Sequence, residues 1–324
     1  MPASMPADAH EELWPLTGSE ILPLSRVKVL QRRTDWHGLV YFSGHVIAQV
    51  ATGALIWLAG LSVWVVPAIL LHGFVLALWF APMHECTHGT AFRTRALNRF
   101  VGLVAGFLIW RPPLYFKYRH AAHHTFTQHP QEDPDIVRLP GSFRAYVAVA
   151  LGLSFWSKLF TILVRSARGR FDDVERGFIP AEELARVRNE TRLFLAAYVA
   201  IIVAALASGH VGALLLYWVL PRLGSEPFLR LIRIAEHTGA AESPNLLENT
   251  RTVLANPVLR FLFWNMPYHA EHHLLPSLPF HALPKLHGDV RPHLACISTS
   301  YWAVHRELLA RLRGKGDPYS PSVA

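Results

Sequence analysis

Four apolar runs in the chain are long enough to cross a lipid bilayer, and they come in two pairs. The runs are residues 38–59, 62–83, 192–208 and 211–232. The short links at Gly60 and Gly209 carry no charged residue, whereas Pro221, Arg222 and Glu226 interrupt the last run. A membrane helix needs about 20 mostly apolar residues. The pattern therefore predicts an all-α membrane protein with four transmembrane helices in two hairpins.

Two further apolar runs are ambiguous. Residues 100–110 are too few to span a bilayer, and residues 143–164 contain Arg144 and Lys158. We expect both to form helices that lie in the membrane interface or pack against the bundle. The alternative is that they form a fifth and a sixth span.

On this basis the chain divides into three parts. Residues 1–34 form a polar lead, residues 35–295 the membrane domain, and residues 296–324 a basic tail. The composition agrees with a membrane protein, because 52% of the residues are hydrophobic and only 17% are charged, unlike an average soluble domain.

The positions of Lys and Arg predict the orientation of the spans. Cationic residues precede the first run, follow the second and precede the third, and the hairpin links contain none. Because cytoplasmic loops are enriched in Lys and Arg, we expect both termini and a helical cap on the cytoplasmic side of a cell's inner membrane. These loops account for most of the net charge of +8, so no nucleic-acid partner is needed. An acidic protein partner is a secondary interpretation.

Three short histidine motifs lie next to the apolar runs. They are His84-Glu-Cys-Thr-His88, His120-Ala-Ala-His123-His124 and His269-Ala-Glu-His272-His273. Residues three and four apart lie on one face of a helix, so we expect the imidazoles of each motif to point the same way. Imidazole is a ligand for zinc, copper, iron and nickel. With only Cys86 and Cys296, neither a zinc finger nor an iron–sulfur framework is available.

A ninth histidine, His237, follows another apolar segment. Nine imidazoles would divide into two coordination spheres of four or five. Any one motif alone is equally typical of a polar surface patch, and His237 alone could simply form a hydrogen bond. Three motifs, each beside an apolar run, favour metal binding.

In their order and spacing, these motifs resemble the histidine boxes of the integral-membrane fatty acid desaturase and hydroxylase superfamily, over residues 35–295. The stretch Glu132-Asp133-Pro134-Asp135 and the run that begins at Asn265 are also similar to the family. The resemblance implies two iron ions (Fe²⁺/Fe³⁺) that activate O₂ at the cytoplasmic mouth of a four-helix bundle. It assigns the metal ligands as His84, His88, His120, His123, His124, His237, His269, His272 and His273.

One position departs from the family pattern. Some members have an asparagine one helical turn before the extra histidine, where it holds a metal-bound water, and here that position is Arg233. Asn265 is the alternative candidate for this role.

Acidic residues near the motifs are candidates for support of the ligands. Ligating imidazoles usually donate their other N–H to a carboxylate or a carbonyl oxygen. The candidates by proximity in sequence are Glu85, Asp133, Asp135, Glu236 and Glu271. For each, an exposed acid on a helix or loop is the alternative.

The leading functional hypothesis is O₂-dependent oxidation of an unactivated C–H bond in a lipid or fatty acyl chain, most simply desaturation. The sequence has no haem-binding, iron–sulfur or dinucleotide motif, so we expect a separate electron donor of the ferredoxin or cytochrome type, with its reductase. A hydroxylase, a ketolase or an oxidative decarboxylase that forms a terminal alkene is the alternative on the same scaffold. A membrane zinc hydrolase needs only three or four ligands and would leave histidines unexplained, and a non-catalytic metal carrier has still less support.

Overall fold

The computed structural model describes residues 21–136 and 138–314, and these residues are almost entirely helical. The first half of the described chain contains α2 (Leu24–Leu30), α3 (Asp35–Ala59), α4 (Val65–Leu78), α5 (Phe80–His88), α6 (Arg95–Leu108), α7 (Pro113–Thr125), α8 (Phe143–Ala150) and α9 (Leu153–Ala167). The second half contains α10 (Asp173–Phe178), α11 (Leu184–Ala207), α12 (Val211–Leu214), α13 (Leu220–His237), α14 (Pro257–Leu262), α15 (His269–Leu274), α16 (Leu283–Val290) and α17 (Tyr301–Leu312). The strands β1 (Thr252–Val253) and β2 (Ile297–Ser298) pair in parallel.

The first predicted hairpin is formed by α3 and by α4 with its continuation α5. Its turn lies at Gly60, whose φ of 55° is readily adopted only by glycine. Asp35–Ala59 and Val65–His88 are both long and apolar enough to cross a membrane. The second candidate span therefore has the first histidine motif as its last five residues.

The second hairpin turns at Gly209, whose φ is 73°, and its outgoing arm Ala181–Ala207 is also a candidate span. The returning arm is helical without a break from residue 211 to residue 237, through a π-helical turn at Leu215–Val219. It is not among the candidate spans, because its second half is polar: Arg222 and Glu226 lie buried and paired at 3.3 Å. A crossing by residues 211–232 thus stays a prediction.

The two ambiguous runs form helices of different kinds. Residues 95–108 form α6, which packs closely on α5: a Cβ atom at Gly102 would lie 3.0 Å from Cys86 Cβ. This helix packs against the bundle, as the sequence indicated. The region 143–167 forms α8 and α9, bent by 46°, and together they pass the length and hydropathy test for one broken span. Within the described residues there are thus three candidate spans, or four with this pair, and the prediction of an all-α membrane protein is confirmed.

Parts of the expected lead and tail are folded onto the core. In α2, Leu30 packs beside Leu286 of α16, and Arg26 Nε donates to Asp289 at 2.8 Å. In α17, Val304 packs beside Ile234 of α13. The remainder of these two segments, residues 1–20 and 315–324, lies outside the described residues.

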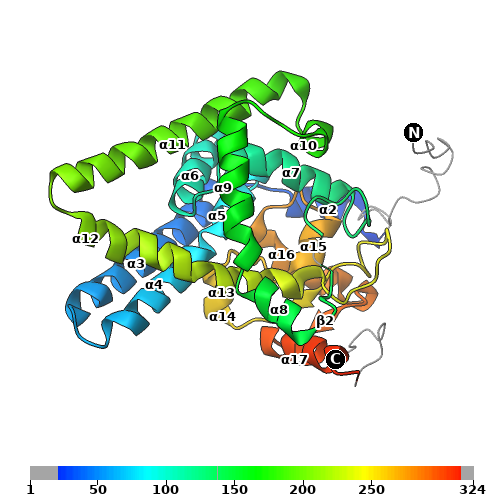
Figure 1. The fold of residues 1–324 in the computed structure, drawn as a ribbon. Helices are drawn as coiled ribbons and strands as arrows, with labels where there is room; N and C mark the ends of the chain where they lie inside the picture. The colour runs from blue at the N-terminus through cyan, green and yellow to red at the C-terminus, as the bar shows by residue number, and fades with distance from the viewer. Residues whose placement is uncertain (1–20, 137, 315–324) are drawn as a thin grey trace.

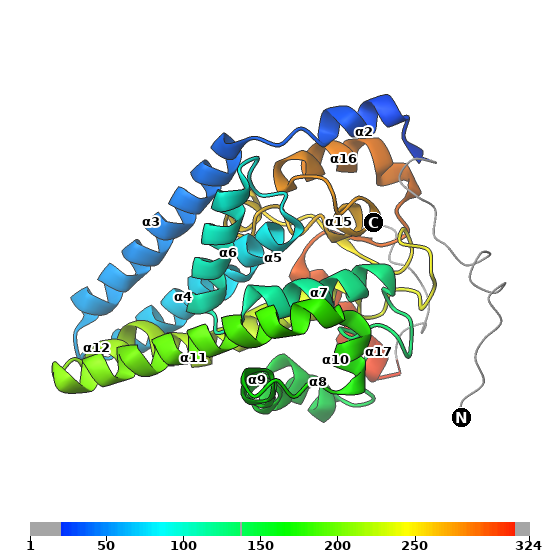
Figure 2. The ribbon, with the colours of Figure 1, turned by 90° about the horizontal axis from the view of Figure 1, so that it is seen from above.

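The hairpin turns and the motif helices lie at opposite ends of the protein. Figures 1 and 2 show the α3–α4 and α11–α12 turns together at the left, with α7, α15 and α16 toward the right. An apolar core that includes Trp79, Phe80, Phe92, Trp264 and Phe280 joins the first hairpin to the histidine-bearing part. The fold therefore gathers the histidine motifs at one end of the bundle.

Candidate metal centre

The nine histidines come together in two adjacent groups. The first group is His84, His88, His120, His124 and His272, and the second is His123, His237, His269 and His273. Within each group the candidate ligand nitrogens lie within 4.8 Å of one another. Segments as distant in sequence as α5 and α15 therefore supply one coordination set.

The helices α7 and α15 each contribute to both groups. His120 and His124 of α7 join the first group while His123 joins the second, and in α15 His272 joins the first group while His269 and His273 join the second. We expected each motif to point to one place, which is confirmed for His84 and His88 and is wrong for the two HxxHH motifs. Successive residues turn by about 100° around a helix, so the second histidine of each HxxHH motif, His123 or His272, diverges from the third and faces the neighbouring group.

The spacing of the imidazole nitrogens fits a metal ion. In the first group, His124 Nε2 lies 2.9 Å from His120 Nε2 and 3.1 Å from His272 Nε2. In the second, His269 Nε2 lies 3.1 Å from His237 Nε2 and 3.2 Å from His273 Nε2. Nitrogens about 2.1 Å from a metal and at right angles are roughly 3.0 Å apart. The two groups therefore have the separation of neighbouring ligands around one ion each.

The protonation of the imidazoles also fits a metal. Burial, followed by the neighbouring imidazoles, lowers the pKa of His269 and His273 well below the ordinary value, so both rings are neutral at pH 7. His237 Nδ1 lies 3.3 Å from the Asn249 carbonyl oxygen; since a carbonyl only accepts, the N–H is on Nδ1 and Nε2 keeps its lone pair. In the first group, His84 Nε2 and His88 Nε2 are buried and have no hydrogen-bond partner among the described residues. A metal ion would use these lone pairs.

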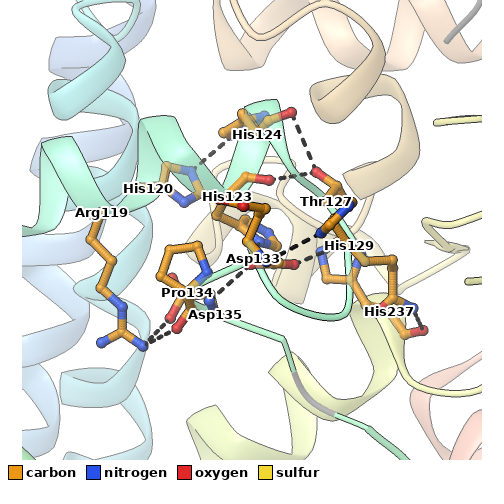
Figure 3. A network of polar contacts seen from close by, with 12 residues as sticks. Arg119, His120, His123, His124, Thr127, His129, Asp133, Pro134, Asp135 and His237 are labelled. Carbon is orange, nitrogen blue, oxygen red and sulfur yellow. Dashed lines mark hydrogen bonds and ion pairs between the residues drawn. The ribbon is translucent and has the colours of Figure 1, made fainter. Parts of the chain in front are cut away.

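Asp133 is the predicted acid that most directly supports a candidate ligand. Its Oδ1 accepts from His123 Nδ1 at 2.8 Å, and its Oδ2 accepts from the Gln128 backbone N–H at 2.9 Å. Figure 3 shows Asp133 beside His123 on the loop that follows α7. This bond fixes the ring of His123 with Nε2 toward the second group.

Glu85 and Glu236 approach imidazoles at longer distances. Glu85 Oε1 lies 3.6 Å from His84 Nδ1 and 3.8 Å from His272 Nδ1, beyond hydrogen-bond distance. Its other oxygen accepts from Thr90 Oγ1 at 2.9 Å. Glu236 Oε2 lies 3.6 Å from His269 Nε2, the nitrogen that faces the other imidazoles of the second group. Glu85 thus lies beside the first group and Glu236 beside the second.

Two other predicted supporting residues, Asp135 and Glu271, have partners outside the two histidine groups. Asp135 pairs with Arg119 at 2.5 Å and with Arg233 at 3.7 Å, and Figure 3 shows the first of these pairs. Glu271 accepts from Thr252 Oγ1 at 2.5 Å and pairs with His287, so it ties α15 to β1 and α16.

Asn265, the alternative candidate for a water-holding residue, contacts a backbone carbonyl oxygen. It has a φ of 56°, and its side chain donates to the Phe280 carbonyl oxygen at 3.3 Å. Arg233, at the position where the family pattern has an asparagine, faces Asp135 and Glu236. The side chain at this position thus forms ion pairs, where the family pattern has the amide of an asparagine.

Sequence reasoning missed Thr127 and Asn249. The Thr127 hydroxyl donates to the His123 carbonyl oxygen at 2.7 Å and lies 3.1 Å from His273 Nδ1, while Asn249 supports His237. The nearness of Thr127 to the second motif was an available signal. Asn249 gave none, because it contacts His237 through its backbone carbonyl oxygen, a group that every residue has.

One family profile matches the chain. The profile of the fatty acid desaturase family covers residues 61–305, which is more than half of the 324 residues and includes all nine histidines. The chain belongs to the fatty acid desaturase family. Membership makes the protein a membrane-associated oxidoreductase that acts on lipid. No curated protein matches the chain significantly.

Proposed function

We propose that this desaturase-family protein holds two iron ions in its two histidine groups and uses O₂ to introduce a double bond into an acyl chain. The observation that carries the proposal is the pair of imidazole groups, of five and four, with ligand-like nitrogen spacings. Bound iron would supply the oxidising power for attack on an unactivated methylene, and the protein would supply its position.

The residues around the first group form an apolar wall suited to a hydrocarbon chain. Phe116 stacks on His120 with ring centroids 4.9 Å apart, and Phe80 lies 5.8 Å from His84. Both phenylalanines belong to the buried core. Such a wall excludes water and holds a chain beside the metal-binding end of the bundle.

The reaction balances with an external donor. Two hydrogens leave adjacent carbons of the chain, and with two electrons and two protons from the donor they reduce O₂ to two waters. A ferredoxin or cytochrome with its reductase is the proposed electron source. We propose that it docks on the basic cytoplasmic loops, so turnover should fall as salt rises. Turnover indifferent to salt would contradict this docking surface.

Hydroxylation, ketolation and alkene formation would begin with the same removal of hydrogen. In hydroxylation and ketolation oxygen then returns to the carbon, whereas in desaturation it does not. Family membership favours desaturation. A zinc hydrolase would use three or four ligands and a bound water and would leave one of the two groups without a role.

Mass spectrometry of lipids from a host that expresses the protein under ¹⁸O₂ tests the reaction. The expected product is two mass units lighter than its precursor and carries no label. A His124→Ala variant is the matched control and should give no new product. Labelled oxygen in the main product would replace desaturation by hydroxylation, and absence of any oxidised lipid would overturn the oxidative function.

We also propose that the histidine motifs face the cytoplasm from the inner membrane. The exposed hairpin residues Leu61 and Ser208 would then lie outside, and Arg95 inside. Cysteines introduced singly at these positions can be labelled in intact cells with an impermeant reagent. Labelling at 61 and 208 but not at 95 is expected, and the reverse pattern would contradict the orientation.

A further inference from the structure

A cavity of about 720 Å³ lies between α7, α9, α10 and α13, next to the candidate metal centre. Phe116 lines it and also stacks on His120, so the cavity reaches the wall of the first histidine group. Toward α10 its boundary includes Arg165 and Asp172, whose side chains are 33% and 48% exposed. The cavity thus extends from the protein surface to Phe116, whose ring separates it from His120.

The charge of the cavity is strongly positive. Its lining contains seven cationic residues and three carboxylates. Arg111 and Arg230 both pair with Glu226, which also pairs with Arg222, so one buried carboxylate serves three guanidinium groups. Burial lowers the pKa of Arg111 to about 9, because the nearby carboxylate offsets only part of the cost of holding this charge away from water.

Polar groups in the same wall are also left without partners. Arg111 Nε, Arg165 Nε and the buried Ser166 Oγ have no hydrogen-bond partner within the described part of the chain, and all three residues line the cavity. The other end of the Arg165 guanidinium, at Nη2, pairs with Asp172 and Glu175. A buried donor without an acceptor costs free energy. An anionic group in the cavity would accept from these donors and neutralise the excess charge.

The remaining wall is apolar. Phe155, Leu159 and Ile162 line the cavity from α9, at the spacing of one helix face, and Leu159 is buried. Lys158 and Arg165 lie two turns apart on the same helix and also line the cavity. One face of α9 therefore offers cationic and apolar groups together, which suits a ligand with a charged head and a hydrocarbon chain.

We propose that this cavity binds the anionic head group of the acyl substrate, through Arg111, Arg165 and Ser166, with the first methylenes along α9 toward Phe116. The acyl part of this inference rests on the proposed function. The head could be a free carboxylate or a phosphate, because both accept from guanidinium and hydroxyl donors.

Equilibrium binding to the purified full-length protein tests the proposal. The probes are palmitate and its neutral analogue methyl palmitate, with palmitoyl-CoA and lysophosphatidate as phosphate-bearing competitors. At least one anionic probe should bind about tenfold or more tightly than methyl palmitate, the effect of one hydrogen bond to a charged group. The competitor that binds tightest identifies the kind of head.

Variants locate the binding site. The double variant Arg111→Gln with Arg165→Gln should bind the preferred anion about as weakly as methyl palmitate, and Ser166→Ala should lose a smaller factor. Arg144→Gln is the matched control, since it removes an exposed charge on α8 that does not line the cavity, and it should leave binding unchanged. If the double variant does not fold, Arg165→Gln alone decides, because its side chain is partly exposed.

Equal affinity for anionic and neutral probes would overturn the proposal, as would an anion preference that survives loss of both arginines. The assay needs neither O₂ nor an electron donor, so it is independent of turnover. Anion binding without lipid oxidation would keep this site and refute the proposed function. Lipid oxidation without a preference for the anionic probes would keep the proposed function and refute this site.

Discussion

The two histidine groups differ in what holds their rings. In the second group, three of the four imidazoles have a partner on Nδ1: Asp133 for His123, Asn249 for His237 and Thr127 for His273. In the first group, the Nδ1 atoms of four imidazoles lack a hydrogen-bond partner in the part of the chain that the structure describes. These four are His84, His120, His124 and His272.

This difference separates two ways of building a metal site. Three of the four rings of the second group are oriented by the protein before any metal arrives, because each outer bond fixes a tautomer and a ring plane. The rings of the first group are oriented by helix packing and by mutual contact, with Glu85 just beyond hydrogen-bond distance. Changes around the second group should therefore affect metal affinity more than comparable changes around the first.

The largest effects should come from the ligands themselves, where the groups should behave alike. His272→Ala removes a nitrogen from the first group and His273→Ala one from the second. Each should lower turnover by more than about 100-fold, the upper end for changes to outer partners, and should lower the iron content per chain measured by elemental analysis. Full activity with either variant would remove that residue from the ligand set.

The acids beside the two groups should differ clearly. Asp133→Asn weakens the hold on His123 and should lower metal affinity or activity by about 10–100-fold. Glu85→Gln should lower metal affinity or activity only a few-fold, because Glu85 Oε1 lies 3.6 Å from His84 Nδ1, beyond hydrogen-bond distance. Metal titration of both variants, with the exposed Asp173→Asn as control, measures the difference. An equal or larger loss for Glu85→Gln would refute the distinction between the groups.

The smallest effect should come from removal of the Thr127 hydroxyl. Thr127→Val removes the acceptor for His273 Nδ1 and should weaken metal binding to the second group by about 1 kcal/mol, or roughly fivefold. Thr125→Val, at an exposed position two residues earlier, changes the same chemistry away from the site and should have no effect. If both variants bind metal as the native protein does, Thr127 does not orient His273.

Sequence patterns located three of the candidate spans and singled out nine histidines that the structure brings together, because hydrophobic run length and motif spacing are local properties. They could not assign imidazoles to groups, since that depends on the angle at which α7 and α15 approach each other. Long-range partners were also out of reach: Asn249 donates to the Thr127 carbonyl oxygen across 122 residues. The span predicted over residues 211–232 stays a prediction, because the structure shows a continuous helix whose polar second half keeps it out of the candidate spans.

The division of α7 and α15 between the two groups has a consequence for assembly of the centre. An ion bound in the second group would fix His123, His269 and His273, and with them the rotation of both helices. The same rotation sets the places of His120, His124 and His272, so only His84 and His88 on α5 remain to be positioned. Uptake of the first ion should therefore raise the affinity for the second, and loading should be cooperative, with few half-filled molecules at equilibrium.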